Sequence, residues 1–124
     1  MLPITVPEKI EAASCPIRNV LDQVTGKWHI LILLALEDEA LRFSEVKRAI
    51  GDVTQRVLTE NLRGLERDGY LTRTVHAGPP LAVSYELTDR GDELVAILKP
   101  VVFWALDNLD DIKKSRATYR AVKE

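Results

Sequence analysis

Residues 54–67, TQRVLTENLRGLER, predict an amphipathic helix with both of its ends marked in the sequence. At about 100° per residue, the three leucines fall on one face and the charged side chains on the opposite one. Thr54 is a residue type that caps helix N-termini, and Asp68-Gly69 ends the pattern, with Gly69 suited to a left-handed backbone. The segments on either side of this helix decide which fold it belongs to.

A second, shorter helix precedes it. Residues 44–50, SEVKRAI, have helical spacing of Val46 and Ile50, with Ser44 as the expected N-cap, and Gly51-Asp52 form a turn. Two strand-like runs, YLTRTVHA and AVSYELT, follow the longer helix around Gly78-Pro79-Pro80. Two helices joined by a short turn and followed by a hairpin predict a winged helix-turn-helix.

The remaining segments predict flanking helices. One helix begins at Pro16 and stops at Thr25-Gly26, and a nearly all-apolar helix follows over residues 27–36. Residues 41–43 suit a short edge strand. Thr88 caps a last helix that Pro100 should kink, and the tail from Lys113 should fray because it has little apolar content.

The predicted fold is therefore α+β and mainly helical, a winged helix-turn-helix with N- and C-terminal dimerisation helices. We expect one domain over residues 1–124, with the helix-turn-helix at about 44–68, the wing at about 70–87 and the C-terminal dimerisation helix at about 88–111.

Composition narrows the functional classes. The chain is 46% hydrophobic and 29% charged, with a net charge of −2, which argues against a protein that simply coats nucleic acid. Residues 42–73 nevertheless hold seven basic and five acidic groups. The longest apolar run, residues 30–36, is too short to span a membrane. Cys15 is the one cysteine, so an internal disulfide is excluded, and we expect a soluble, cytoplasmic protein.

The polar face of the 54–67 helix carries side chains of the types that can read DNA bases. Gln55, Arg56, Thr59 and Arg63 lie within its first three turns and offer an amide, guanidinium groups and a threonine methyl. The alternative is a core helix with a solvated charged side. Glu60 does not fit a DNA-facing helix unless it accepts from a cytosine amine or pairs with Arg56 or Arg63.

Other candidate DNA contacts lie near this helix in sequence. Thr54 stands at its start, Arg73 and His76 are the candidate cations of the wing, and Arg42 and Lys47 are candidate phosphate contacts. For Lys47, surface solvation explains the residue equally well.

Catalytic and metal sites find little support. Gly26-Lys27-Trp28 lacks the rest of a phosphate-binding loop, and His29 and His76 are separated with no cysteine cluster, so we expect no enzyme, no metal and no cofactor. His29 is expected to be a hydrogen-bonded core or interface histidine. Trp28 and Trp104 are expected in the core, although they could also line a pocket for a small effector.

Several motifs together resemble the HxlR-type winged helix regulators, whose architecture is related to the MarR group. They are Cys15-Pro16, GKW at 26–28, FSE at 43–45, VTQRVLTENLRGLERDGYLTR at 53–73 and VSYELTDRG at 83–91. The resemblance implies a homodimer that binds an inverted repeat in double-stranded DNA. It also implies that the N-terminal and last helices form the interface between the two subunits. The wing departs from the family pattern because Leu81-Ala82 intervene before the second strand.

The resemblance also gives Cys15 a candidate role, because some family members sense oxidants or electrophiles with a cysteine there. A thiol beside a helix N-terminus has a lowered pKa, which favours reaction. The alternative is a small buried side chain at the dimer interface. The rival to a DNA-binding regulator is a winged helix used only for protein–protein interaction.

Overall fold

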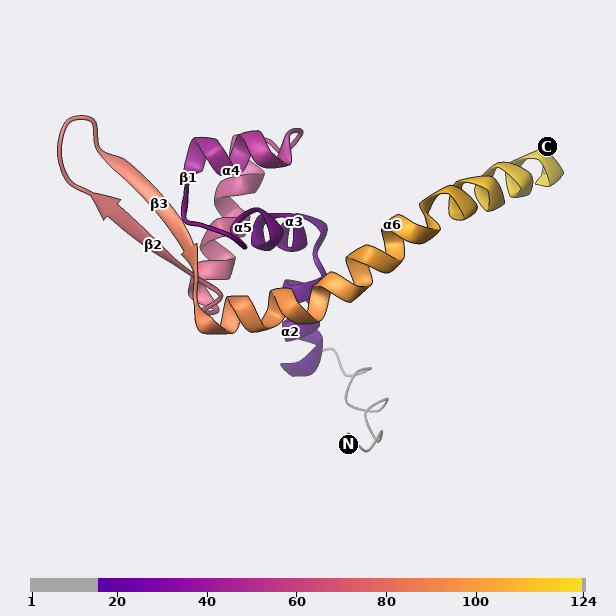
Figure 1. Ribbon diagram of the computed structural model, residues 1–124, viewed down its shortest axis with the longest axis horizontal. Coiled ribbons are helices and arrows are strands. Elements are labelled where there is room, and N and C mark those ends of the chain that lie inside the picture. The colour runs from indigo at the N-terminus through magenta and orange to yellow at the C-terminus, as the bar shows by residue number, and fades with distance from the viewer. Residues whose placement is uncertain (1–15, 124) are drawn as a thin grey trace.

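The computed structural model describes residues 16–123 and has the predicted order of elements (Figure 1). The helices are α2 (Pro16–Thr25), α3 (Lys27–Ala35), α4 (Phe43–Ile50), α5 (Gln55–Arg67) and α6 (Asp89–Lys123), and the strands are β1 (Leu41–Arg42), β2 (Leu71–His76) and β3 (Ala82–Leu87). The prediction of a mainly helical α+β winged helix-turn-helix is confirmed.

The start of α4 differs from the prediction. The helix begins at Phe43 with Arg42 as its N-cap, so Ser44 lies inside the first turn and does not cap it. Glu45 replaces the expected serine cap from within the helix, because its Oε1 accepts a hydrogen bond of 2.8 Å from the backbone N–H of Arg42. A carboxylate in the first turn can satisfy a free N–H as a serine hydroxyl would.

The three strands form an antiparallel sheet in the order β1-β3-β2. Leu71 pairs with Leu87 at the base of the wing, and His76 pairs with Ala82 near its tip. In β3, Tyr85 is buried while its neighbour Glu86 is exposed. The sheet therefore turns one side toward the helices at its base, and the hairpin tip projects away from them (Figure 1).

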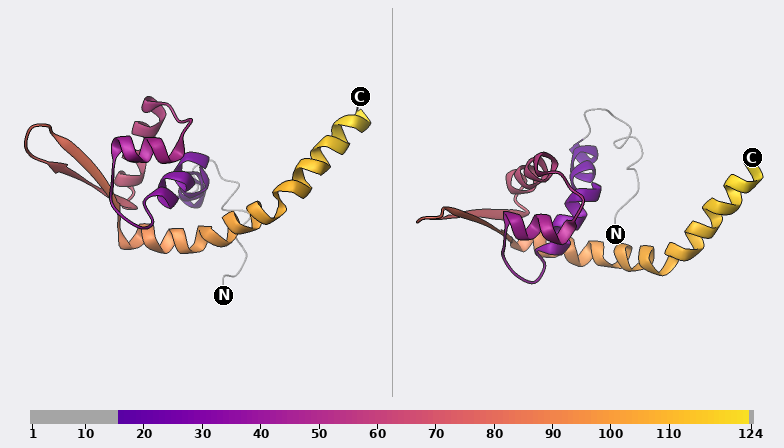
Figure 2. Two further views of the ribbon diagram at one scale, coloured as in Figure 1. Left: turned by 45° about the horizontal axis from the view of Figure 1, so that its top comes forward. Right: turned by 90° about the horizontal axis from the view of Figure 1, so that it is seen from above.

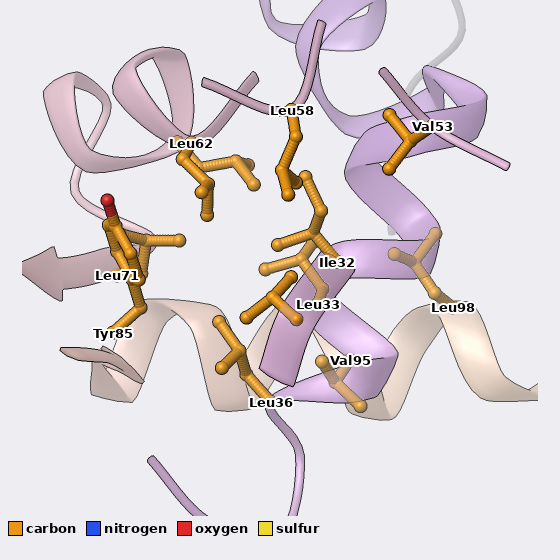
Figure 3. Packing of buried hydrophobic residues seen from close by; sticks show 12 residues of the cluster. Ile32, Leu33, Leu36, Val53, Leu58, Leu62, Leu71, Tyr85, Val95 and Leu98 are labelled. Carbon is orange, nitrogen blue, oxygen red and sulfur yellow. The ribbon is translucent and has the colours of Figure 1, made fainter. Parts of the chain in front are cut away.

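The core lies where α3, α5, the base of the sheet and the start of α6 meet (Figure 3). Its buried apolar side chains are Ile32, Leu33, Leu36, Val46, Val53, Leu58, Leu62, Leu65, Leu71, Tyr85, Val95 and Leu98. The three leucines of α5 are at most 1% exposed, and each buried leucine contributes roughly 1.5–3 kcal/mol through loss of apolar contact with water. Burial of this face fixes which side of α5 remains outside.

The last helix is longer than predicted. Thr88 caps it, since Thr88 Oγ1 accepts from the Gly91 N–H at 3.2 Å, but the tail expected to fray from Lys113 is helical to Lys123. Each backbone N–H of an α-helix bonds to the carbonyl four residues earlier, which needs no apolar side chain, and residues 113–123 contain no glycine or proline to interrupt these bonds. Pro100 lies inside α6, and the helix bends along its length (Figure 2). The kink predicted at Pro100 itself stays a prediction.

Candidate nucleic-acid interface

Helix α5 is fixed at both ends by its own sequence. At the start, Thr54 Oγ1 accepts a hydrogen bond of 3.2 Å from the Val57 N–H, which confirms the predicted cap. At the end, Gly69 has a φ of +84°, and the Tyr70 N–H donates back to Leu65 O at 2.9 Å. This is the glycine-terminated helix end that the sequence predicted. Both ends of α5 are therefore fixed by local hydrogen bonds, and its polar face points away from the core.

Glu60 has a hydrogen-bond partner on its own helix. Its Oε1 accepts a hydrogen bond of 3.2 Å from Arg56 Nε, one turn earlier on the same face of α5. The Arg56 side chain is 88% exposed, so it remains accessible to a ligand from solvent. Glu60 thus pairs with Arg56, one of the two partners that the sequence offered.

A hollow of about 380 Å³ brings together four of the predicted site residues. Gln55, Thr59 and Arg63 recur every four residues along α5 and line one wall, and Arg73 joins them from β2. An amide, a hydroxyl and two guanidinium groups are the donors and acceptors that bind base edges and phosphate oxygens. This hollow, with the exposed Arg56 beside it on α5, is the candidate interface.

The hollow is also lined by three residues that were not predicted as site residues from the sequence. Phe43 and Tyr85 contribute apolar and phenolic surface from α4 and β3, and Glu66 adds a carboxylate from α5. Glu66 continues the spacing of Thr59 and Arg63, so helical periodicity could have identified it. Phe43 and Tyr85 come from other elements, and only the tertiary fold brings them to this site.

The remaining candidate cations lie apart from the hollow's lining. Arg42 is exposed on β1, whereas Lys47 in α4 is half-buried, which does not support simple surface solvation of that residue. On the wing, His76 Nε2 lies 2.8 Å from Ser84 Oγ in a hydrogen bond across the two strands. Of the two candidate contacts on the wing, only Arg73 lines the hollow with the residues of α5.

His29 departs from the expectation of a hydrogen-bonded core histidine. It is half-buried in α3, and its Nδ1 is buried without a hydrogen-bond partner among the described residues. Burial lowers the pKa of His29 from its ordinary value of 6.5; the charge of Asp68 acts in the opposite direction and that of Arg67 reinforces the shift. The residue therefore favours its neutral form at physiological pH.

Cys15 lies outside the described residues. Trp28 packs against the core as expected, but Trp104 is 59% exposed, so the prediction of core packing was wrong for Trp104. Over residues 16–123, no group of His, Cys, Asp or Glu side chains could hold a metal ion, and no helix is long and apolar enough to cross a membrane.

Comparison with known proteins gives close matches over most of the chain. It is 38% identical over 101 residues to the uncharacterized HTH-type transcriptional regulator YtfH of Escherichia coli (strain K12), covering 82% of this chain and 80% of that protein. The solved structure of ytfH from Salmonella typhimurium has a TM-score of 0.80 at 37% identity, covering 86% and 95% of the two chains.

A third match concerns a redox-responsive protein. The redox regulator HypR in its oxidized form has a TM-score of 0.70 at 37% identity, covering 76% of this chain and 97% of that one. A MarR-family structure is also similar, in agreement with the predicted architecture. The HxlR-like helix-turn-helix family matches residues 23–113, which include the helix-turn-helix, the wing and most of α6. The chain therefore belongs to the HxlR-like helix-turn-helix family of DNA-binding transcriptional regulators, which are not enzymes.

Proposed function

We propose that this protein is a homodimeric, cytoplasmic regulator that binds an inverted-repeat operator in a sequence-specific manner. The observation that carries the proposal is the polar face of α5. This is the second helix of the helix-turn-helix, and its first turns carry exposed Gln55, Arg56 and Arg63 and half-buried Thr59, away from the buried leucines. In proteins of this architecture the second helix enters the major groove with its N-terminal residues toward the bases.

The candidate contacts divide into two groups by chemistry and position. Thr54, Gln55, Arg56 and Thr59 stand at the N-terminal end of α5 and are the proposed base readers. Arg63 and Arg73, which share the hollow, reach between bases and backbone. Arg42, Lys47 and His76 lie on the surrounding elements and are the proposed phosphate contacts.

The exposed apolar surface supports a homodimer. On α6, Phe103, Trp104 and Leu106 are 56%, 59% and 62% exposed, and on α2 Val20 is 53% exposed. Large apolar side chains gathered on two terminal helices are rarely left in water, and a second copy would cover them. Such a dimer would place its two α5 helices about 34 Å apart, one turn of DNA.

Redox control through Cys15 is the regulatory part of the proposal. Cys15 directly precedes α2 in the sequence, and the positive end of a helix dipole favours the reactive thiolate. The similarity to the redox regulator HypR adds support. With one cysteine per chain, oxidation would give a disulfide between subunits or an adduct with a small thiol. A small-molecule effector is the other form of control that the family resemblance allows.

Footprinting of the purified protein on the intergenic DNA beside its own gene tests the proposal. The expected result is protection of a symmetric repeat, with half-sites one helical turn apart. Protection without sequence preference, or no binding at all, would instead favour a winged helix that serves only protein–protein interaction.

A further inference from the structure

Helix α6 has two parts of opposite charge. Residues 89–111 hold six acidic and two basic residues, whereas residues 112–123 hold five basic residues and no acidic one. We call residues 112–123 the basic arm; its basic residues are Lys113, Lys114, Arg116, Arg120 and Lys123. All but the first two residues of the arm lie beyond the range that the family matches.

The outer half of α6 lies away from the rest of its own subunit. Both figures show the helix leaving the domain, and its C-terminal end is on the opposite side of the molecule from the wing (Figures 1 and 2). Lys113, Lys114 and Arg120 form no ion pair with another described residue, and neither do Asp89, Asp92 and Glu93 at the start of α6. Both charged ends of the helix are therefore available to a partner.

We propose that the basic arm lies along the acidic start of α6 in a second copy of the chain, so that the two α6 helices pair antiparallel. This inference rests on the proposed homodimer and adds its orientation. In a symmetric antiparallel pair, a residue that follows the two-fold axis lies opposite one that precedes the axis by the same number of positions. With the axis midway between residues 103 and 106, at the exposed apolar side chains, residues 113–120 lie opposite residues 89–96.

The residues that this pairing requires at the interface share one face of α6. Asp92, Lys99, Phe103 and Leu106 are spaced by seven, four and three residues, so they share one face of α6. Lys99 Nζ lies 6.0 Å from the centre of the Phe103 ring, which confirms that these two side chains are neighbours. The acidic start and the exposed apolar middle of α6 thus form one continuous strip.

The negative surface beside that strip extends beyond α6. Glu37, Asp38 and Glu86 line a hollow of about 140 Å³ together with Asp92, and Lys99 is the described cation that bonds to this group, through Glu37 Oε2 at 2.6 Å. An arm with five positive charges complements this surface. In a parallel pair, by contrast, like charges would face each other at both ends, which costs energy.

Reversing the charges of the two segments, first separately and then together, tests the antiparallel orientation of the α6 helices. One variant reverses the charge of the basic arm and carries Lys113→Glu/Lys114→Glu/Arg120→Glu. A second variant reverses the charge of the start of α6 and carries Asp89→Lys/Asp92→Lys/Glu93→Lys. A third variant combines all six substitutions. Sedimentation equilibrium at low and high salt gives the dimer dissociation constant, and circular dichroism checks folding. We expect each single reversal to weaken the dimer by roughly tenfold at low salt, and the combined variant to recover to within about threefold of wild type.

The control separates this inference from the homodimer itself. Leu106→Asp removes the apolar contact at the centre and should give monomers whatever the arm does. If Leu106→Asp is monomeric but arm reversal leaves the dissociation constant unchanged, the homodimer stands and the arm inference falls. If Leu106→Asp remains dimeric, the proposed interface is wrong. Arm reversal that weakens DNA binding of the intact dimer, without changing dimerisation, would assign the arm to phosphates and overturn the inference.

Discussion

Arg56 Nε and Glu60 Oε1 lie 3.2 Å apart on the exposed face of α5, in the part of the helix that is proposed to meet DNA. Both side chains are largely in solvent, so the pair contributes at most a few tenths of a kcal/mol to the fold. We expect the pair to affect DNA binding instead, because the Glu60 carboxylate holds the Arg56 guanidinium along the helix and would itself repel phosphates.

Replacing Glu60→Gln should therefore raise affinity for DNA. The change removes one negative charge and frees Arg56, so we expect severalfold tighter binding to specific and random duplexes at low salt. Fluorescence anisotropy over a range of salt concentrations measures it. Asp22→Asn on α2 provides the same charge change near Arg67, at the opposite end of α5 from Arg56, and should have little effect. Equal gains from both variants would show that only net charge matters.

Arg56→Ala should weaken specific binding by roughly 1–3 kcal/mol, because a guanidinium can bond bidentately to guanine. Lys47→Ala should instead reduce the dependence of binding on salt, since a phosphate contact releases counterions. Parallel titrations on an operator and a scrambled duplex distinguish the two. If Arg56→Ala lost as much affinity on the scrambled duplex as on the operator, the residue would not be a base reader.

Gly91→Ala should destabilise the fold, because a β-carbon at residue 91 would clash with the carbonyl oxygen of Tyr70. Overpacking of this kind costs roughly 1–3 kcal/mol. Urea unfolding followed by circular dichroism measures the loss. Ala96→Gly is a control on the exposed side of the same helix, where the change costs about 1 kcal/mol through helix propensity alone. An unchanged midpoint for Gly91→Ala would contradict the close packing of α6 on the segment after α5.

Stability should fall on mild acidification because of His29. Its folded-state pKa lies below the ordinary 6.5, so the unfolded chain binds the proton more readily. Neutral His29 therefore makes its full contribution to the free energy of unfolding above pH 6.5. This contribution is lost as the pH falls toward the lower pKa of the folded state, and below that pKa the stability no longer changes because of His29. Urea unfolding from pH 7.5 to 5 should show a steeper decline for wild type than for His29→Gln. His76→Gln on the wing controls for loss of one imidazole; superimposable curves for wild type and His29→Gln would refute the prediction.

Oxidant sensitivity should depend on Cys15. A mild thiol oxidant is expected to release DNA from the wild-type protein and to leave Cys15→Ser bound, because the thiolate is the reactive species. Gel-shift titration with and without a reductant shows both release and recovery. Identical responses of the two proteins would remove Cys15 from the proposal.

The sequence predicted much of the fold because the signals were local. Thr54 and Thr88 marked helix starts, Gly69 marked a helix end, and the leucines of α5 gave its buried face. Each of these depends on residues within one or two turns, so the printed order of residues suffices to find them. The prediction of Ser44 as the N-cap of α4 was wrong because the side chain of Glu45, one position further on, accepts the hydrogen bond from the Arg42 N–H.

The site was less predictable because it is assembled from separate elements. The pairing of Leu71 with Leu87 and the packing of the sheet bring Arg73 and Tyr85 to the hollow beside Arg63, although residues 63 and 85 are 22 positions apart in the chain. The close contact between Gly91 and Tyr70 is likewise a product of tertiary packing. Helix α6 was predicted too short because apolar periodicity, the signal used, ends before the helix does.

The start of α6 is tied to the end of α5 by short hydrogen bonds. Thr88 Oγ1 donates to Gly69 O at 2.6 Å, and Arg90 donates to Asp68 O at 2.9 Å. These bonds join the end of α5 to the start of α6 around residues 68–70, so we expect the two helix ends to move together. In the proposed homodimer, a twist between the subunits that tilts α6 would then change the spacing between the two α5 helices. The distance between two half-sites on DNA would then set which twist the protein can adopt.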